Sequence, residues 1–140
     1  MKSLLAFFYN NFAFVYLDPS YRLTDSETTG SAVDRASLTI TGPQLTIRLI
    51  NERTAMQCVV APTKNIGPKN WFWIELIRQF IDGIDATTPV PAKELANWFG
   101  ENLSRVEALF AEETSDDSCA ALSEMRLANA IKEFGRPKNL

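Results

Sequence analysis

Arginines and carboxylates are the residues of this 140-residue chain that could do chemistry, because the sequence contains no histidine. Catalysis by a Ser-His-Asp or Cys-His arrangement and metal binding by histidine are therefore excluded within this chain. The two cysteines, Cys58 and Cys119, are too few for a four-thiolate zinc site. Their spacing matches no disulfide framework or Cys-x-x-Cys motif, so both are expected to be free thiols in a reducing cytoplasm. The sequence predicts no metal site and no cofactor.

The first candidate site is a group of four carboxylates, Glu112, Glu113, Asp116 and Asp117, which we call the acidic corner. Paired carboxylates can bind a divalent cation or act as acid and base, but this spacing does not match an EF-hand loop. In a simpler interpretation, Asp116 and Asp117 stabilise the N-terminus of a last helix through its dipole, and Ser115 or Asp116 caps it. In a third, the acidic corner binds a basic protein such as a nuclease toxin, because opposite charge speeds the encounter.

The second candidate site consists of two arginines, Arg22 and Arg48, on the polar face of a predicted sheet. Directly opposed side chains on such a face lie about 5 Å apart and could act together on a ligand or on an incoming strand. In the simpler interpretation, the face is only solvated and has no such role, since threonine favours strands by itself. The other residues predicted on this face are Thr24, Ser37, Thr39, Thr46 and Gln57.

Alternation of apolar and polar residues predicts the strands that must position these side chains. It is clearest in residues 35–41, 44–50 and 55–61, and residues 21–27 could form a first strand. Short polar turns separate these segments, which indicates a three- to four-stranded antiparallel meander with one face buried. The residues predicted on the buried face are Leu38, Ile40, Leu45, Ile47, Leu49, Met56, Cys58 and Val60.

Apolar residues at helical spacing predict the remaining elements. The fold class is therefore α+β in a single domain, residues 1–140, in which an N-terminal helix and three C-terminal helices cover one face of the sheet. The predicted helices are residues 3–17, residues 71–82, a helix from Pro91 to about residue 112, and a last helix closed by Gly135.

The helix predicted over residues 71–82 has Asn70 as its expected N-cap and Gly83 as its expected end. Its polar residues form one narrow stripe, so most of its surface should be buried. It opens with three large aromatic rings, Trp71, Phe72 and Trp73. Three rings in a row cannot all face inward, so at least one is expected to meet the surface or a partner.

The charge distribution narrows the class of partner. The formal net charge is −3 and the pI is about 5.0, which disfavours general binding to nucleic acid or to anionic membranes. Residues 1–70 carry seven Lys and Arg against five Asp and Glu, whereas residues 71–140 carry seven against twelve. The excess of negative charge therefore lies in the helical half. No segment approaches the roughly 20 uninterrupted apolar residues of a membrane span.

Three stretches resemble a known kind of protein. They are Arg-Leu-Ile-Asn-Glu-Arg at residues 48–53, the aromatic helix that ends at Ile81-Asp82-Gly83, and the helix from Glu101 to Phe110. Together they are similar to small uncharacterised bacterial α+β proteins, in the style of the immunity proteins of polymorphic toxin systems. The resemblance covers most of residues 3–112, without the helix after residue 114. It implies a binding role and carries over no catalytic residue.

Three functions are weighed for this chain. The leading expectation is a non-enzymatic bacterial interaction protein of the cytoplasm that neutralises a basic toxin by binding it. The alternative is a small-molecule or peptide-binding module that uses a pocket between sheet and helices; a cavity holding Arg22 or Arg48 among convergent polar groups would favour it. An enzyme based on carboxylates and arginine ranks third, and a buried carboxylate pair in a cleft would favour that function.

Overall fold

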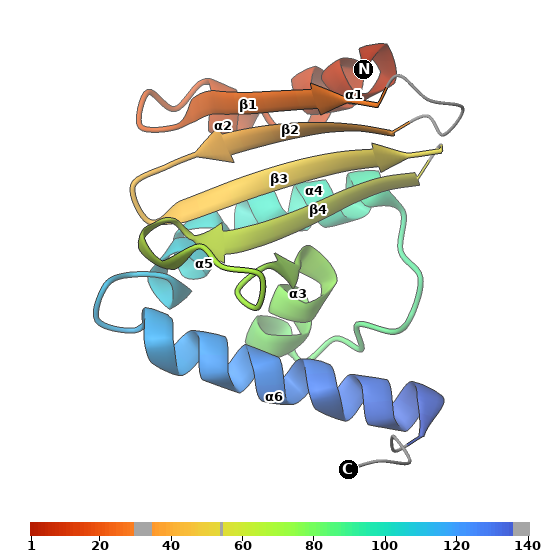
Figure 1. The fold of residues 1–140 in the computed structure, drawn as a ribbon, viewed down its shortest axis with the longest axis vertical. Helices are drawn as coiled ribbons and strands as arrows, with labels where there is room; N and C mark the ends of the chain where they lie inside the picture. Colours follow the sequence, from red (N-terminus) through yellow and green to blue (C-terminus); the bar gives the residue numbers. More distant parts are fainter. Residues whose placement is uncertain (30–34, 54, 136–140) are drawn as a thin grey trace.

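A five-stranded antiparallel sheet forms the centre of the protein, in a computed structural model that describes residues 1–29, 35–53 and 55–135 (Figure 1). Each strand pairs with the next one along the chain, so the sheet is a meander, as predicted. It has one strand more than the largest predicted number. The strands are β1 (Arg22–Thr28), β2 (Arg35–Thr41), β3 (Leu45–Glu52), β4 (Ala55–Pro62) and β5 (Phe72–Trp73).

The helices confirm the α+β class, but two of the four predicted helices are each divided into two. The predicted helix over residues 3–17 is divided at Phe12, and the helix predicted from Pro91 is divided at Asn102, because both residues leave helical geometry (φ −123° and −119°). A short 3₁₀ turn, η1 (Thr63–Asn65), follows β4. The α-helices are α1 (Lys2–Asn11), α2 (Ala13–Tyr16), α3 (Ile74–Asp82), α4 (Ala92–Glu101), α5 (Leu103–Leu109) and α6 (Ser115–Phe134).

The strand register confirms the predicted buried face. Leu38 pairs with Leu49, and Leu49 pairs with Cys58, so these three side chains point to the same side of the sheet. The other five predicted residues lie on that side too, since Ile40, Ile47 and Val60 form a second row and Leu45 and Met56 keep the same alternation. Six of the eight are fully buried; Met56 and Cys58 are partly buried.

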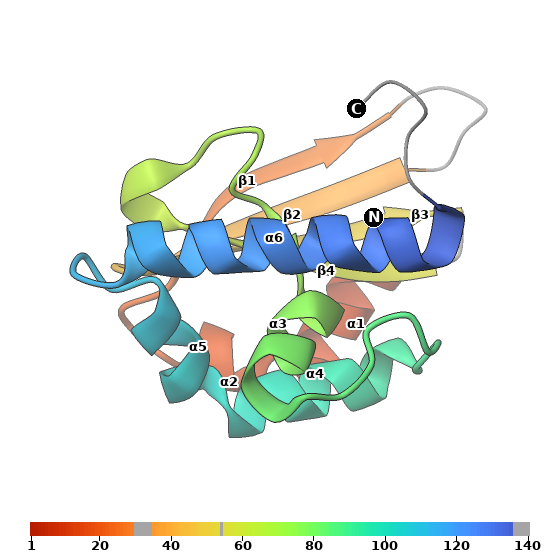
Figure 2. The ribbon, with the colours of Figure 1, turned by 90° about the horizontal axis from the view of Figure 1, so that it is seen from below.

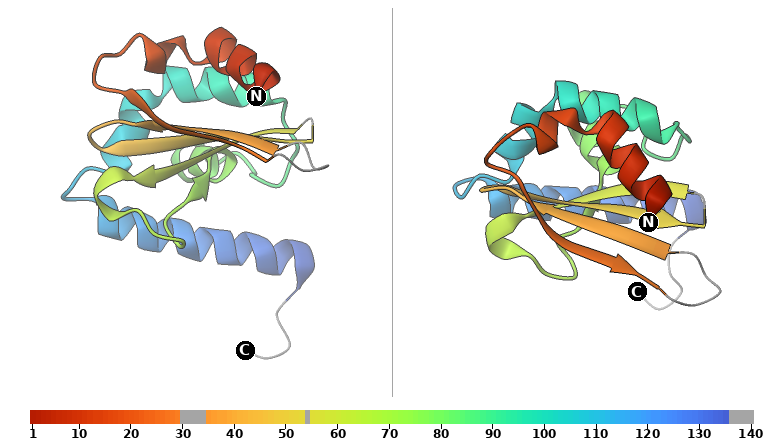
Figure 3. Two further views of the ribbon diagram at one scale, coloured as in Figure 1. Left: turned by 45° about the horizontal axis from the view of Figure 1, so that its top comes forward. Right: turned by 90° about the horizontal axis from the view of Figure 1, so that it is seen from above.

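Helices α1, α2, α4 and α5 lie on the apolar side of the sheet (Figure 3), together with α3, which contacts β4. Aromatic rings join the layer internally: Phe99 of α4 lies 5.4 Å from Phe14 and 6.3 Å from Phe12, between ring centroids. Gly100 lets Phe14 come close, because a Cβ at residue 100 would meet its ring at 2.8 Å. The N-terminal segment is therefore held on the sheet by α4.

Helix α6 lies elsewhere than predicted, because it flanks the β5 edge of the sheet and does not cover its apolar face (Figure 2). It packs on α3, where Asn129 and Gln79 exchange side-chain hydrogen bonds of 2.7 and 3.3 Å. Arg126 donates to the carbonyl oxygens of Trp71 (3.0 Å) and Lys69 (3.1 Å). The buried residues of α6 all belong to its first half, so its second half has little apolar surface to place against the sheet.

The aromatic segment is extended where a helix was predicted. Phe72 and Trp73 pair with Val60 and Val59 of β4, so α3 begins only at Ile74. Asn70 does not cap the helix; its side chain donates to the carbonyl of Asn65. Pairing with a buried strand here outweighs the local helical pattern. The predicted end is confirmed, because Gly83 adopts the left-handed conformation (φ 72°) that closes helices.

Candidate functional site

The acidic corner lies where α5 turns into α6, and all four of its carboxylates are exposed. Glu112 and Glu113 belong to the turn, and Asp116 and Asp117 to the first turn of α6. Three of them, all but Asp117, line a hollow of about 340 Å³. Its opposite wall consists of the β2–β3 turn and the segment after β4, including Lys64. The structure therefore brings the four predicted residues together beside a concave surface.

The charges of the acidic corner are mostly free. Glu112 forms an exposed ion pair with Lys64 at 3.5 Å, a kind of contact that contributes about 0–1 kcal/mol. Glu113, Asp116 and Asp117 form no ion pair with any described residue. The position of Asp116 and Asp117 in the first turn of α6 also fits the helix-dipole interpretation, since that end carries partial positive charge.

The predicted cap of α6 is wrong. The N-cap residue is Thr114, and neither Ser115 nor Asp116 occupies that position. The Thr114 hydroxyl points back and donates to the carbonyl of Ala108 at 2.7 Å, which ties α6 to the end of α5. The N-cap of α6 makes no side-chain capping hydrogen bond, and the Asp116 carboxylate lies inside the first turn, not at the cap position.

The polar sheet face is partly covered by the segment after β4. Thr63 donates to the carbonyl of Gly42 at 2.8 Å and lies 2.9 Å from the Thr46 hydroxyl, so Thr46 is buried. Arg48 is held in place as well: its guanidinium lies 4.4 Å over the ring of Trp71. Its Nε donates to the hydroxyl of Thr39 at 3.4 Å. Contacts with neighbouring side chains therefore hold Thr46 and Arg48 in place, so this half of the face is not simply exposed to solvent.

The two predicted arginines of this face do not form one site. Arg22 pairs with Thr41 and is exposed on β1, whereas Arg48 belongs to the neighbouring row with Thr39. A hollow of about 200 Å³ lies beside Arg48 and does not include Arg22. The charged and hydroxyl side chains that line it are Asp25, Glu27, Thr28, Thr29, Arg35, Ser37, Thr39 and Arg48.

The cavity between sheet and helices measures only about 100 Å³. It is mostly apolar, with Phe7, Met56 and Phe99 among its walls, and one carboxyl group, Glu75, borders it. Burial raises the pKa of Glu75, while Arg78 acts in the opposite direction. Burial also raises the pKa of the neighbouring Cys58 thiol, which stays protonated near neutral pH. Ligand pockets usually measure about 300–1,000 Å³, so this one is too small for a drug-sized molecule.

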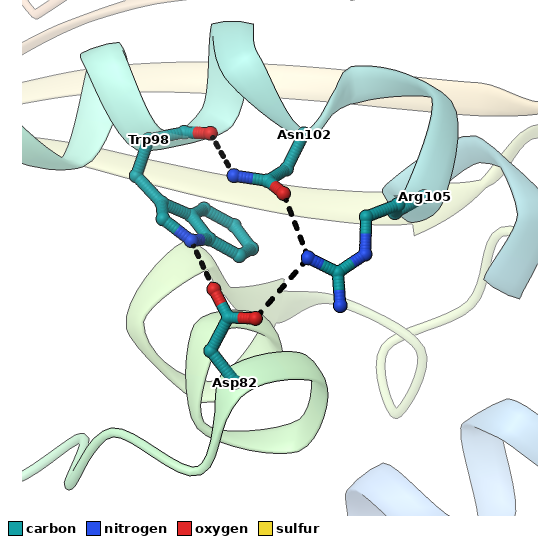
Figure 4. A network of polar contacts seen from close by, with 4 residues as sticks. All are labelled: Asp82, Trp98, Asn102 and Arg105. Carbon is teal, nitrogen blue, oxygen red and sulfur yellow. Dashed lines mark hydrogen bonds and ion pairs between the residues drawn. The ribbon is translucent and has the colours of Figure 1, made fainter.

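The polar stripe of α3 makes contacts that the sequence did not predict. Arg78 is buried, and its Nε has no hydrogen-bond partner in the part of the chain that the structure describes. Asp82, one turn later, accepts hydrogen bonds from Trp98 and Arg105 (Figure 4). Trp73 follows the expectation for three adjacent rings, because it remains 39% exposed. The narrow polar stripe on this helix was the only sequence signal for these residues. It could not identify their partners, because Trp98 and Arg105 belong to helices that come later in the chain.

Comparison of the chain with protein-family models, with curated proteins and with solved structures finds no match. In the described residues, no helix is both long and apolar enough to cross a membrane. Nor does this part of the chain contain a group of three or more cysteine, aspartate or glutamate side chains placed to hold a metal ion. The proposal for function therefore depends on the geometry of the surfaces above.

Proposed function

We propose that this chain is a non-enzymatic bacterial interaction protein of the cytoplasm, which binds a basic protein such as a toxin through its acidic corner. The supporting observation is the cluster of free charge beside a hollow: Glu113, Asp116 and Asp117 are exposed and form no ion pair with a described residue. Such carboxylates accelerate encounter with a cationic surface, and salt screens the effect over about 8–10 Å. The resemblance to immunity proteins points to the same role.

Charge reversal of the acidic corner tests this proposal. The variant changes Glu112, Glu113, Asp116 and Asp117 to lysine, and its association rate is measured with a basic toxin domain sought among products of neighbouring genes. We expect slower association at low salt and a flatter salt dependence than wild type.

A matched control keeps the same change in net charge. It replaces the exposed glutamates Glu27, Glu52, Glu94 and Glu101 by lysine. If the control slows association as much as the corner variant, net charge alone governs the encounter and the assignment of the site is wrong. Circular dichroism melting of both variants separates loss of binding from loss of folding.

A second candidate function, a small-ligand module, is favoured by the hollow beside Arg48. Two guanidinium groups and four hydroxyl side chains line it, which suits a small ligand with a carboxylate or phosphate group. It ranks second because Asp25 and Glu27 line the same hollow and repel an anion. Calorimetric titration with inorganic phosphate and citrate tests it. Heat that disappears in Arg48→Met supports this function, and its absence at millimolar ligand contradicts it.

A further inference from the structure

Strand β4 pairs with β3 along one edge, but its other edge is only partly paired. Strand β5 pairs with Val59 and Val60 alone, because the chain leaves the sheet into α3 at Ile74. Among residues 1–29, 35–53 and 55–135, no strand pairs with residues 55–58 on that edge. Within the described chain, no hydrogen bond from outside the β3–β4 ladder reaches the backbone of these four residues. Unpaired N–H and C=O groups of this kind can pair with another extended segment.

The opposite edge of the sheet, formed by β1, is protected in the usual ways. Strand β1 carries the charged residues Arg22, Asp25 and Glu27, and its pairing shifts register after Leu23. Charges and bulges both hinder pairing with a further strand. Residues 55–58 of β4 are Ala, Met, Gln and Cys, so this free edge carries no charge. Of the two edges, that of β4 lacks both kinds of protection.

An open groove of about 460 Å³ lies next to this free edge. Gln57 of β4, Trp73 of β5 and Glu75 of α3 line one side of it, and Glu133 and Phe134 line it from α6. The C-terminal half of α6 runs along this side of the molecule (Figure 1). Four extended residues measure about 13 Å, and residues 126–134 of α6 measure about 12 Å. The unpaired edge and the segment of α6 that lines the groove are therefore of similar length.

Large apolar side chains are exposed in the groove. Trp73 is 39% exposed and Phe134 is 79% exposed. Both line the groove and come from opposite walls, one from β5 and the other from α6. Exposed aromatic rings that face one concave surface are typical anchors for a partner's side chain.

The free charge of the groove is negative. Glu75 and Glu133 form no ion pair with any residue that the structure describes. Arg126, which also lines the groove, is already engaged, since it donates to two carbonyl oxygens and lies 4.9 Å over the Phe72 ring. Arg78 acts on Glu75 from its own helix without forming an ion pair. A lysine or arginine of a partner therefore complements this surface.

We propose that the groove binds an extended, basic segment of a partner protein, which pairs with residues 55–58 of β4 as an added strand. Its apolar side chains pack on Trp73 and Phe134, and its basic side chains face Glu75 and Glu133. This surface is distinct from the acidic corner, because Asp116 and Phe134 stand about 27 Å apart along α6. The backbone pairing provides affinity and the alternate side chains provide specificity.

Phage display tests the proposal. Peptides that bind the full chain are selected from a library of random seven-residue sequences. The selected peptides are synthesised with fluorescein, and binding is measured by fluorescence anisotropy. We expect apolar residues that alternate with Lys or Arg. We expect Phe134→Ala and Trp73→Ala to weaken binding about tenfold or more, as truncated anchors do. Leu17→Ala removes an apolar side chain on the N-terminal segment that is nearly as exposed as Phe134 (74%), and it should change nothing.

Two further measurements separate strand addition from other modes of binding. Two versions of a selected peptide are N-methylated, one at its odd-numbered and one at its even-numbered amides. Only one version should lose binding, because neighbouring amides of a strand point to opposite sides and only one set faces β4. The double variant Glu75→Gln, Glu133→Gln should weaken the binding of basic peptides, whereas Glu94→Gln in the first turn of α4 should leave it unchanged. If Trp73→Ala fails to fold, Phe134→Ala alone carries the comparison.

Several outcomes would overturn the proposal. They are the failure to select any peptide, equal binding by Phe134→Ala and wild type, and tolerance of N-methylation in both sets. Light scattering gives a further outcome: a dimer that Phe134→Ala dissociates would show that a second copy of the chain occupies the groove.

Discussion

The indole Nε1 of Trp98 donates a 2.7 Å hydrogen bond to Oδ2 of Asp82, and Arg105 donates to the other oxygen of the same carboxylate at 3.1 Å (Figure 4). These residues belong to α4, α3 and α5, respectively. Asn102 completes the network, since it accepts from Arg105 at 2.9 Å and donates to the Trp98 carbonyl at 2.9 Å. One carboxylate thus connects three helices across the linker of residues 83–91.

The Asp82 carboxylate should make stability depend on pH. The hydrogen bond from Trp98, together with Arg105, holds its pKa below the ordinary value. Because the folded-state pKa is lowered, its stabilising contribution is present above about pH 4 and is lost as the pH falls through the folded-state value. We expect Asp82→Asn to lower the free energy of unfolding most at neutral pH. Urea unfolding between pH 3 and 7 measures this, and an equal loss at every pH would contradict it.

Glu75 should have the opposite effect. Burial raises its pKa, so the charged form is disfavoured in the folded state, and stability falls as the pH rises through the raised value. We expect Glu75→Gln to gain stability relative to wild type at pH 7, and to lose that gain below about pH 4, where the wild-type carboxyl is protonated in both states. Thermal melts of the two proteins at both pH values check the sign. Glu94→Gln, an exposed first-turn glutamate, serves as the control.

Two phenylalanines should differ in their contribution to the core. Phe99 is fully buried against Phe12 and Phe14, whereas Phe80 of α3 is only partly buried. We expect Phe99→Ala to cost about 3–5 kcal/mol and Phe80→Ala about 1–3 kcal/mol, because the cost follows the buried volume that is lost. Denaturant unfolding of both variants ranks them, and a larger loss for Phe80→Ala would show that the burial pattern is wrong.

Arg126 should fix α6 on the body of the protein. Its two hydrogen bonds to backbone carbonyls and its contact with the Phe72 ring connect α6 with the segment before α3. We expect Arg126→Ala to lower the free energy of unfolding by about 2 kcal/mol, the range for hydrogen bonds from charged groups. Hydrogen exchange should become faster in α6 and stay unchanged in β2 and β3. Arg126→Lys should restore little, since lysine lacks the planar fork.

The sequence by itself determined the central meander and its buried face. Leu38, Leu49 and Cys58 share one side because alternation along a strand is a local property, and the polar turns fix which strands are neighbours. The end of α3 at Gly83 was equally predictable, since the left-handed conformation that closes a helix suits glycine. These features need only residues that are close in the chain.

The tertiary structure alone decided where the aromatic segment, α6 and the groove lie. Residues 71–73 have a helical pattern, but pairing with Val59 and Val60 makes Phe72 and Trp73 extended. The environment of Arg48 depends on Trp71, and the position of α6 depends on contacts of Arg126 and Asn129 with residues about fifty positions earlier. No local period encodes such contacts, because their energy comes from surfaces that meet only after the chain has folded.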